Sequence, residues 1–462
     1  MTDAQDHPVV KDIVSRFESR TPKSKVNDQA AQNRLPGGDT RTATYYLPYP
    51  AYMDHGRGCK LYDVDGNEYL DMLNNYTSLI HGHCHPSVTK AARDQLEKGT
   101  VFGSATEIQY KHAEHLCDRV PSLDMVRYGN SGTEGTLFAM RAARAFTGKE
   151  LFIKMDGGYH GSHDYIEVNV FPGSAPAGGV PIPRHTEPGA PQSVLNDMLV
   201  APFNNLNAVE DLLKENQGKV AAIMTEPMMG ALGMVRPQPG FLQGLRDLAD
   251  KYDTLLIFDE VITFRISTGG IQKVEGVTPD ITALGKIIGG GMPVGAFGGR
   301  REIMEPFSPR HPQTLFHSGT FNGSDITMAA GLAAMEAFDQ AAVDHVNALG
   351  EKFRQGVPAA FAKAGITGMA TGLGSLAQVH WKLGTIAKAM DTVEGLFLAG
   401  ELPRLLHLEM MNRGVYSAFR GMFVVSTPMT EADIDFALDA LAGALDTLTP
   451  YVKDIAPHLL AG

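Results

Sequence analysis

The segment from Thr254 to Arg300 restricts the fold of this chain more than any other segment. An apolar run at residues 255–258 ends at Asp259, and a second apolar patch leads to Lys286 and a triple glycine. Short apolar runs bounded by turn residues are typical of buried strands in an α/β sheet. Reactive groups in such sheets lie at the carboxyl ends of the strands. We therefore expect Asp259 and Lys286 to face the same small molecule.

The chemistry of these two residue types narrows the choice of that molecule. A lysine in apolar, glycine-lined surroundings loses solvation, so its pKa falls and its amine can form a Schiff base. A carboxylate at a buried strand end can hold a proton on a pyridine nitrogen, as pyridoxal chemistry requires. The pair Lys286 and Asp259 therefore leads to the hypothesis of a pyridoxal phosphate site.

Composition excludes several other classes of protein. The 462 residues are enough for two or three domains, and 43% hydrophobic with 20% charged residues is ordinary for a soluble globular protein. The formal charge of -12 argues against a nucleic-acid or anionic-membrane partner. Three irregularly spaced cysteines favour a reduced compartment. We find neither a signal peptide nor an apolar run of about 18 residues, so we expect a cytoplasmic protein outside the membrane.

Two short motifs resemble metal sites only superficially. Cys59–Asp71 has calcium-like acidic spacing, but its glycine is misplaced and the Asp65-Gly66 pair predicts a hairpin turn. The histidines of His81–Pro86 would share one face of a strand, which is the arrangement most favourable to a metal. Gly82 and the proline instead favour a loop before a helix at residues 87–97. We therefore expect no metal site.

The second informative stretch is the start of a predicted helix that ends at Gly148. It is preceded by Ser131, Gly132 and Thr133. Unpaired N–H groups at a helix start, with hydroxyls beside them, can bind an anion. The alternative is an ordinary Ser/Thr cap with Glu134 in the first turn. Beside a pyridoxal phosphate site, a phosphate cradle becomes the favoured interpretation.

The neighbouring segments predict the rest of the sheet. A strand beginning at Leu151 runs into a glycine-rich turn that presents Tyr159 and His160, and residues 165–200 read as a long loop. A buried strand at residues 220–225 ends at Glu226. Strands and helices alternate from about residue 125 to 300, which predicts a mostly parallel sheet covered by helices.

The remainder of the chain predicts a smaller second domain. We expect a turn and long helix at 317–338, a helix at 349–364 that Gly356 and Pro358 interrupt, strands at 374–380 and 414–425, and a last helix at 431–447. The predicted division is an N-terminal arm with part of the small domain at 1–70, a large cofactor-binding domain at 71–330, and a C-terminal small domain at 331–462.

Together these motifs resemble those of the class III, fold-type I pyridoxal phosphate-dependent aminotransferases. The likeness is greatest to the branch of glutamate-1-semialdehyde aminomutases and β-amino-acid transaminases such as β-phenylalanine aminotransferases. The motifs are NSGTE (130–134), GGYHG (157–161), TEP (225–227), IFDEV (257–261), LGKIIGGGMPVGAFGGR (284–300) and SGTF (318–321). The resemblance implies an α/β fold with a seven-stranded, mostly parallel sheet and a smaller α+β domain built from both termini.

The resemblance also implies roles for individual residues. Lys286 would form the Schiff base and shuttle protons, and Asp259 would pair with the pyridinium nitrogen. Thr320 would reach the phosphate from the partner subunit, which implies an obligate homodimer with shared sites. The full cofactor-binding set that the resemblance implies is Ser131, Gly132, Thr133, Tyr159, His160, Glu226, Asp259, Val261, Lys286 and Thr320, with Val261 and Tyr159 on opposite faces of the ring.

One departure from the family pattern concerns the substrate. The family commonly has glycine before Phe-Arg after the DEV motif, whereas this chain reads DEVITFR, so Arg265 is displaced and receives no substrate role. β-Phenylalanine aminotransferases are similar in this shortening. Arg41 and Arg420 are the candidates for binding a substrate carboxylate, since guanidinium binds carboxylate bidentately. The alternative is that each is a solvated or ion-paired structural arginine.

The resemblance implies a transaminase that moves an amino group from an amino acid, β- or aromatic, or from an amine to a 2-oxo acid through pyridoxamine phosphate. The alternative is an aminomutase that shifts the amino group within one semialdehyde molecule. A non-catalytic binding protein on the same fold would be expected to lose Lys286 or Asp259, and both are present.

Overall fold

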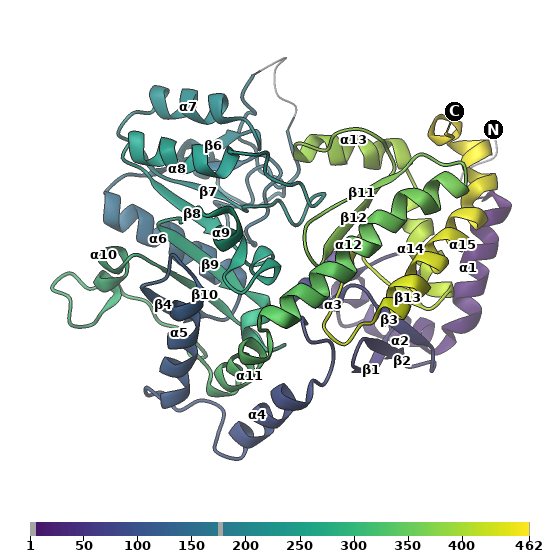
Figure 1. The fold of residues 1–462 in the computed structure, drawn as a ribbon, viewed down its shortest axis with the longest axis horizontal. Helices are drawn as coiled ribbons and strands as arrows, with labels where there is room; N and C mark the ends of the chain where they lie inside the picture. The colour runs from purple at the N-terminus through teal and green to yellow at the C-terminus, as the bar shows by residue number, and fades with distance from the viewer. Residues whose placement is uncertain (1–5, 174–178, 462) are drawn as a thin grey trace. The chain divides into compact units, whose positions relative to one another are not determined.

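The computed structural model describes residues 6–173 and 179–461, and the chain divides into two compact units (Figure 1). The small unit combines both ends of the chain, Met1–His85, His345–Thr385 and Val393–Gly462. The large unit consists of Pro86–Asp344 with Ile386–Thr392. The expectation of a small domain assembled from both termini is therefore confirmed.

The large unit is built on a seven-stranded sheet in the order β4-β10-β9-β8-β7-β5-β6. Neighbouring strands run parallel except β10, which pairs antiparallel with both β4 and β9. This confirms the predicted α/β class with a mostly parallel sheet. The strands are β4 (Met125–Gly129), β10 (Gly295–Gly299), β9 (Ile281–Gly285), β8 (Leu255–Asp259), β7 (Val220–Thr225), β5 (Leu151–Met155) and β6 (Met198–Ala201).

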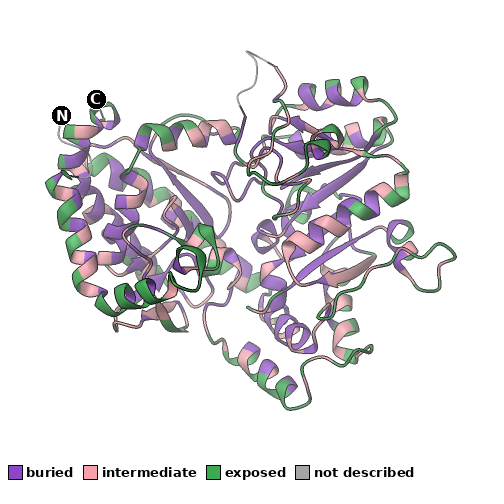
Figure 2. Ribbon diagram, turned by 180° about the vertical axis from the view of Figure 1, so that it is seen from behind, coloured by how far each residue is buried: buried purple, intermediate pink, exposed green. Residues whose placement is uncertain are grey.

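The central strands are apolar along their whole length because helices cover the sheet. Every residue of β7, β8 and β9 is buried, which explains their continuous apolar runs (Figure 2). Helix α6 (Gly132–Thr147) packs on β10 and β9, and α8 (Phe241–Lys251) packs on β8 and β7. The other helices of the large unit are α4 (Pro86–Leu96), α5 (Glu107–Arg119), α7 (Leu206–Glu215), α9 (Gly270–Glu275), α10 (Arg301–Met304) and α11 (Asp325–Ala337).

The small unit contains two sheets, ordered β1-β2-β3-β13 and β11-β12-β14. The predicted hairpin is present, because β2 and β3 pair antiparallel on either side of the Asp65-Gly66 turn. The strands are β1 (Met53–Arg57), β2 (Lys60–Asp63), β3 (Glu68–Asp71), β11 (Met369–Thr371), β12 (Leu376–His380), β13 (Val415–Tyr416) and β14 (Met422–Val424). The helices include α1 (Pro8–Arg20), α2 (Pro22–Ala31), α14 (Leu402–Asn412) and α15 (Glu431–Ile455).

Several predicted boundaries were wrong, mostly in the last third of the chain. Helix α12 (Gln340–Lys363) continues through Pro358, because buried Phe353 and Phe361 hold it on either side of the missing N–H. The strand predicted at 414–425 is divided into β13 and β14, and α13 (Ala389–Ala399) and α14 were not predicted. The predicted loop at 165–200 ends earlier, at β6, and its residues 174–178 lie outside the described residues.

The histidine motif forms a loop, as expected. Nε2 of His83 lies 2.8 Å from Oδ2 of buried Asp71, whose other oxygen accepts the N–H groups of Leu73 and Asn74. Within residues 6–173 and 179–461 there is no group of three histidine, cysteine or acidic side chains able to hold a metal ion. No helix in the same ranges is long and apolar enough to cross a membrane.

Candidate active site

Three neighbouring strands of the large unit deliver the ionisable residues of the site. Strand β8 ends at Asp259, β9 is followed directly by Lys286, and β7 is followed directly by Glu226. Strands β7, β8 and β9 run parallel and adjacent, with Thr225 paired to Phe258 and Asp259 paired to Ala283. The carboxyl ends of all three strands therefore meet at one edge of the sheet, as the sequence predicted.

Lys286 stands in an unusual backbone conformation. Its φ is +53°, in the left-handed region that costs a non-glycine residue about 1–2 kcal/mol. Burial lowers the pKa of its amine to about 8, while the charges of Asp259 and Glu226 oppose this shift. About half of the amine is therefore uncharged at pH 8, and the uncharged form is the state that attacks a carbonyl carbon.

Asp259 is held by the chain on both of its oxygens. Its Oδ2 lies 2.8 Å from Nδ1 of His160, and its Oδ1 accepts the N–H of Val261 at 3.0 Å. Burial lowers the pKa of His160, while its bond to Asp259 opposes the shift. A neutral imidazole that donates from Nδ1 satisfies this geometry. Its Nε2 is buried without a hydrogen-bond partner among the described residues.

Glu226 holds two backbone groups with its carboxylate. Oε1 accepts the N–H of Tyr159 at 3.0 Å, and Oε2 accepts the N–H of Gly230 at 2.8 Å. Burial, and then the charge of Asp259, raise the pKa of Glu226 to about 8. Glu226 thus fixes the turn that carries Tyr159, whose side chain is 40% exposed.

The start of α6 has the Ser/Thr cap, and the phosphate cradle stays a prediction that the local geometry fits. Ser131 is the N-cap residue, and its hydroxyl accepts the N–H of Glu134 at 3.2 Å. The hydroxyl of Thr133 accepts the N–H of Ser162 at 3.2 Å. At Gly161, with φ of +110°, a Cβ would lie 2.4 Å from the Thr133 hydroxyl oxygen. The backbone therefore approaches the helix start closely enough to form a cradle, and the helix N-terminus favours an anion there.

The remaining predicted residues belong to the small unit or to the loop before α11. Arg41 and Arg420 belong to the small unit, and Arg41 donates to Oδ1 of Asn75 at 2.8 Å. Burial raises the pKa of the Tyr76 hydroxyl, and the positive charges of Arg420 and Arg41 oppose this shift. Thr320 is exposed in the loop before α11. Arg41, Arg420 and Thr320 therefore remain predicted site residues.

Sequence reasoning assigned no role at the site to two buried basic residues that act on it. Arg265 is fully buried in a short 3-10 segment, Thr263–Ile266, and its positive charge contributes to lowering the pKa of Lys286. Lys154 is fully buried in β5 and donates to the carbonyl of Gly158 in the Tyr159 turn. A charged residue inside an otherwise apolar run, as in LFIKM and ITFRI, is the sequence signal that would have found both.

Comparison with known proteins places the chain in a family. The model of the family Aminotransferase class-III matches residues 42–430. A glutamate-1-semialdehyde 2,1-aminomutase of Ignicoccus hospitalis is 42% identical over 91% of this chain and 98% of its own length. Among solved structures, an omega-transaminase from Sphaerobacter thermophilus is 41% identical with a TM-score of 0.88, covering 92% of this chain and 97% of that one. A β-phenylalanine aminotransferase from Variovorax paradoxus is 33% identical with a TM-score of 0.87, covering 98% and 99%.

The fold and the site thus define a fold-type I pyridoxal phosphate enzyme. The chain belongs to the class III aminotransferases, with pyridoxal 5'-phosphate as its cofactor. The residues present fit this group, because a buried amine of lowered pKa, a carboxylate held on both oxygens and a close-packed helix start lie in one unit.

Proposed function

We propose that this protein is a transaminase that moves an amino group from an amino acid, β- or aromatic, or from an amine to a 2-oxo acid. The observation that carries the proposal is the placement of Lys286 and Asp259 at the ends of adjacent parallel strands. An amine and a carboxylate held apart in this way can act on opposite ends of one flat, conjugated cofactor.

Each group then has a defined task. Pyridoxal phosphate, when bound, supplies an electron sink for charge that develops at the substrate carbon. Asp259, held by His160 and by the N–H of Val261, keeps a proton on the ring nitrogen. The amine of Lys286 would move the proton at the substrate carbon as a general acid and base, a role that contributes typically about 10²–10⁴-fold. Ser131, Gly132 and Thr133 hold the phosphate at the start of α6.

For the substrate carboxylate we propose Arg41 and Arg420. The support for this assignment is that the positive charges of both act on the same hydroxyl, that of Tyr76. Two positive charges that act on one aromatic side chain suit a substrate that has both a carboxylate and an aromatic ring. Complete burial of Arg265 supports leaving that residue out of substrate binding.

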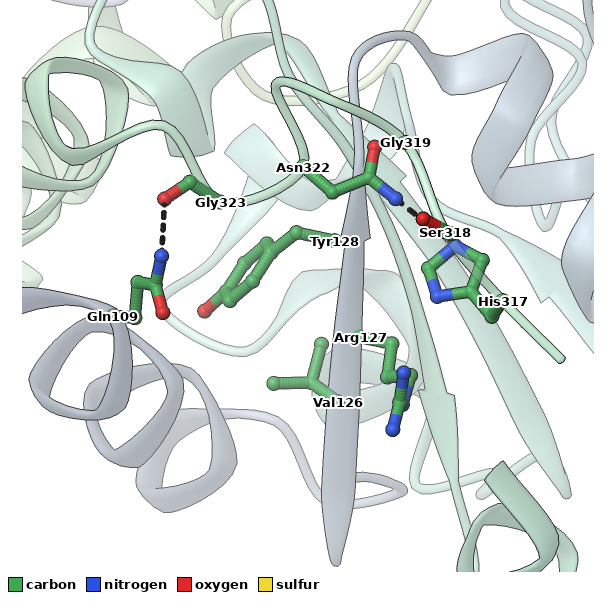
Figure 3. Close-up of a pocket in the computed structure, with 9 residues that line it drawn as sticks. All are labelled: Gln109, Val126, Arg127, Tyr128, His317, Ser318, Gly319, Asn322 and Gly323. Carbon is green, nitrogen blue, oxygen red and sulfur yellow. Dashed lines mark hydrogen bonds between the residues drawn. The ribbon is translucent and has the colours of Figure 1, made fainter. Parts of the chain in front are cut away.

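We further propose that the active unit is a homodimer in which Thr320 reaches the phosphate of the partner subunit. The loop around Thr320 presents Phe316 and Phe321 to solvent, with 82% and 60% of their surface exposed. The same loop forms one wall of a pocket of about 300 Å³ against β4, where Asn322 bonds His317 (Figure 3). Exposed aromatic side chains beside a concave surface are typical of a face that another protein covers.

The second candidate function is an aminomutase. Its support is the 42% identity to a protein named glutamate-1-semialdehyde 2,1-aminomutase over nearly the whole chain. Both reactions use Lys286, Asp259 and the phosphate cradle. They differ in whether the amino group leaves on an external acceptor.

One incubation series separates the two functions. The holoenzyme is supplied with β-phenylalanine, D-phenylglycine, a primary arylalkylamine or glutamate semialdehyde, each with and without 2-oxoglutarate or pyruvate. A transaminase consumes the amino donor beyond one equivalent per site only when the acceptor is present. An aminomutase isomerises the semialdehyde without an acceptor, and that outcome would overturn the proposal.

A spectroscopic control tests the cofactor assignment itself. The purified holoenzyme should show a visible-region absorbance band that Lys286→Ala removes. Lys273→Ala is the matched control, because Lys273 is an exposed lysine of α9 that donates to Thr268. A colourless wild type, or a band that survives in Lys286→Ala, would contradict the assignment.

A further inference from the structure

The Lys154 amine is buried in the sheet, and among the described residues no carboxylate forms an ion pair or hydrogen bond with it, although the charge of Asp156 acts on it. Its Nζ donates instead to backbone carbonyls, to Gly158 at 2.9 Å, to Ile166 at 3.5 Å and to Val168. Burying an ammonium costs several kcal/mol unless it is well bonded, and an apolar residue would fill the same place at lower cost. Packing alone therefore does not explain why a lysine occupies this position.

The three carbonyls belong to the two ends of one loop. Gly158 opens the loop that presents Tyr159 and His160, and Ile166 and Val168 close it. The N–H of Gly157 donates to the carbonyl of Asn169 at 2.8 Å, which joins the same two ends a second time. Lys154 therefore ties the first residue of the turn to the returning segment.

One peptide unit in this turn is held from both sides. Its carbonyl, that of Gly158, accepts from Lys154, and its N–H, that of Tyr159, donates to Oε1 of Glu226 at 3.0 Å. The two side chains lie on adjacent strands, β5 and the end of β7. A peptide plane bonded at both its oxygen and its nitrogen cannot rotate without breaking one of these two hydrogen bonds.

The orientation of that plane fixes the position of the next residue in the turn. This residue, His160, bonds Asp259 through Nδ1, and its own carbonyl accepts from Thr136 at 2.6 Å. A rotation of the Gly158–Tyr159 peptide would move the Tyr159 ring and pull the His160 imidazole from the 2.8 Å contact with Asp259. Catalytic groups tolerate displacements of only about 0.5 Å before their contribution falls.

We propose that Lys154 is a positioning residue, which together with Glu226 clamps the Gly158–Tyr159 peptide and so sets the place of Tyr159 and His160 against the cofactor. The proposal rests on the proposed function for its catalytic consequence. The clamp itself is a property of the chain and is measurable without cofactor.

The test compares Lys154→Met with a matched control in the same unit. Arg119→Met removes another basic side chain that donates to backbone carbonyls, those of Thr268, Met335 and Phe338, none of which lies in residues 157–168. Hydrogen exchange of the full chain is followed by mass spectrometry, with and without pyridoxal phosphate. In Lys154→Met, peptides covering 157–168 should exchange faster by about 10-fold while other peptides change little. Arg119→Met should leave residues 157–168 unchanged.

The second readout is the dissociation constant of pyridoxal phosphate, measured by equilibrium dialysis. Lys154→Met should raise it by about 10-fold, the scale of outer-shell hydrogen bonds at metal sites. Arg119→Met should leave it unchanged even where both variants lose equal thermal stability. Lys154→Arg, whose guanidinium can also donate to carbonyls, should recover part of the affinity. Should Lys154→Met fail to fold, Lys154→Gln gives the same comparison with a weaker, uncharged donor.

The outcomes separate the clamp from the function. The proposal of a clamp would be overturned if residues 157–168 exchanged at equal rates in Lys154→Met and Arg119→Met. It would also be overturned if exchange became faster to the same extent in all peptides of both variants. A wild type that binds no pyridoxal phosphate would overturn the proposed function, and the exchange experiment on the same chain would still decide the clamp.

Discussion

Nδ1 of His160 lies 2.8 Å from Oδ2 of Asp259, although 99 residues separate them in the chain. Both side chains are buried, and the second oxygen of Asp259 is bonded to the N–H of Val261. The carboxylate that is to hold a proton on a ring nitrogen is thereby fixed in direction by two hydrogen-bond donors. The role of His160 can be tested directly because its other ring nitrogen has no partner among the described residues.

His160→Leu should lower kcat because the charged carboxylate of Asp259 loses the hydrogen bond that it accepts from Nδ1 of His160. Such bonds contribute about 1.5–3 kcal/mol, which corresponds to roughly a 10- to 150-fold loss. His160→Asn is the matched variant, since its amide nitrogen can donate from nearly the position of Nδ1, and it should lose less. Steady-state kinetics with one donor and acceptor pair measure both. Equal losses in the two variants would show that the donated bond is not what matters.

The rate at which the cofactor-free protein takes up pyridoxal phosphate should rise with pH to a plateau, with a midpoint near 8. Burial lowers the pKa of Lys286 to about 8 from 10.5, and only the uncharged amine attacks the aldehyde. Asp259→Asn should move the midpoint to lower pH, because the Asp259 charge raises the pKa of Lys286. Stopped-flow absorbance measures the rate. A wild-type midpoint near the ordinary lysine value would contradict the buried amine.

Lys286→Met should stabilise the cofactor-free protein near neutral pH. The folded pKa of Lys286, about 8, lies below the value of 10.5 for an unfolded lysine, so the unfolded chain binds more protons between these limits. The cost of keeping Lys286 protonated, roughly 3 kcal/mol, is therefore fully present below pH 8 and is lost as pH rises to 10.5. Denaturant unfolding at the two extremes should show a gain at neutral pH that shrinks at alkaline pH. A gain independent of pH would point to packing instead.

Arg41→Ala and Arg420→Ala should raise KM for donors that have a carboxylate. Loss of a charge-assisted bond costs about 1.5–3 kcal/mol, so the increase in KM should be roughly 10-fold or more. An arylalkylamine without a carboxylate is the internal control, and its KM should stay nearly unchanged. An unchanged KM for amino acids in Arg41→Ala would remove that residue from the substrate site and leave the structural interpretation through Asn75.

Mixing two inactive variants should restore activity if Thr320 acts across the subunit boundary. In a hybrid dimer of Thr320→Val and Lys286→Ala subunits, one site then contains both lesions and the other contains neither. Random exchange of subunits should therefore recover about a quarter of the wild-type activity. Refolding the variants together and assaying the mixture measures this. Without any recovery, Thr320 acts within its own subunit or the chain does not form shared sites.

The motifs led to the proposed reactive residues because pyridoxal phosphate chemistry needs particular residue types in particular places. A single lysine before a triple glycine, an aspartate at the end of an apolar run and a hydroxyl-rich helix start are local features, and strand and helix boundaries follow from local periodicity. The same locality explains the errors. Pro358 was expected to interrupt α12, and only the packing of its neighbours Phe353 and Phe361 explains why the helix continues.

The sequence by itself determined the cofactor class and the seven-stranded fold, and it led to Lys286 and Asp259 as the proposed reactive pair. Only the tertiary structure decided which side chains support them. His160 bonds Asp259, and Lys154 and Glu226 both bond the Gly158–Tyr159 peptide. These hydrogen bonds depend on the strand order β8-β7-β5, which no local sequence pattern contains. Hydrogen bonds are short-ranged and directional, so they exist only after non-local strand pairing has brought their partners within about 3 Å.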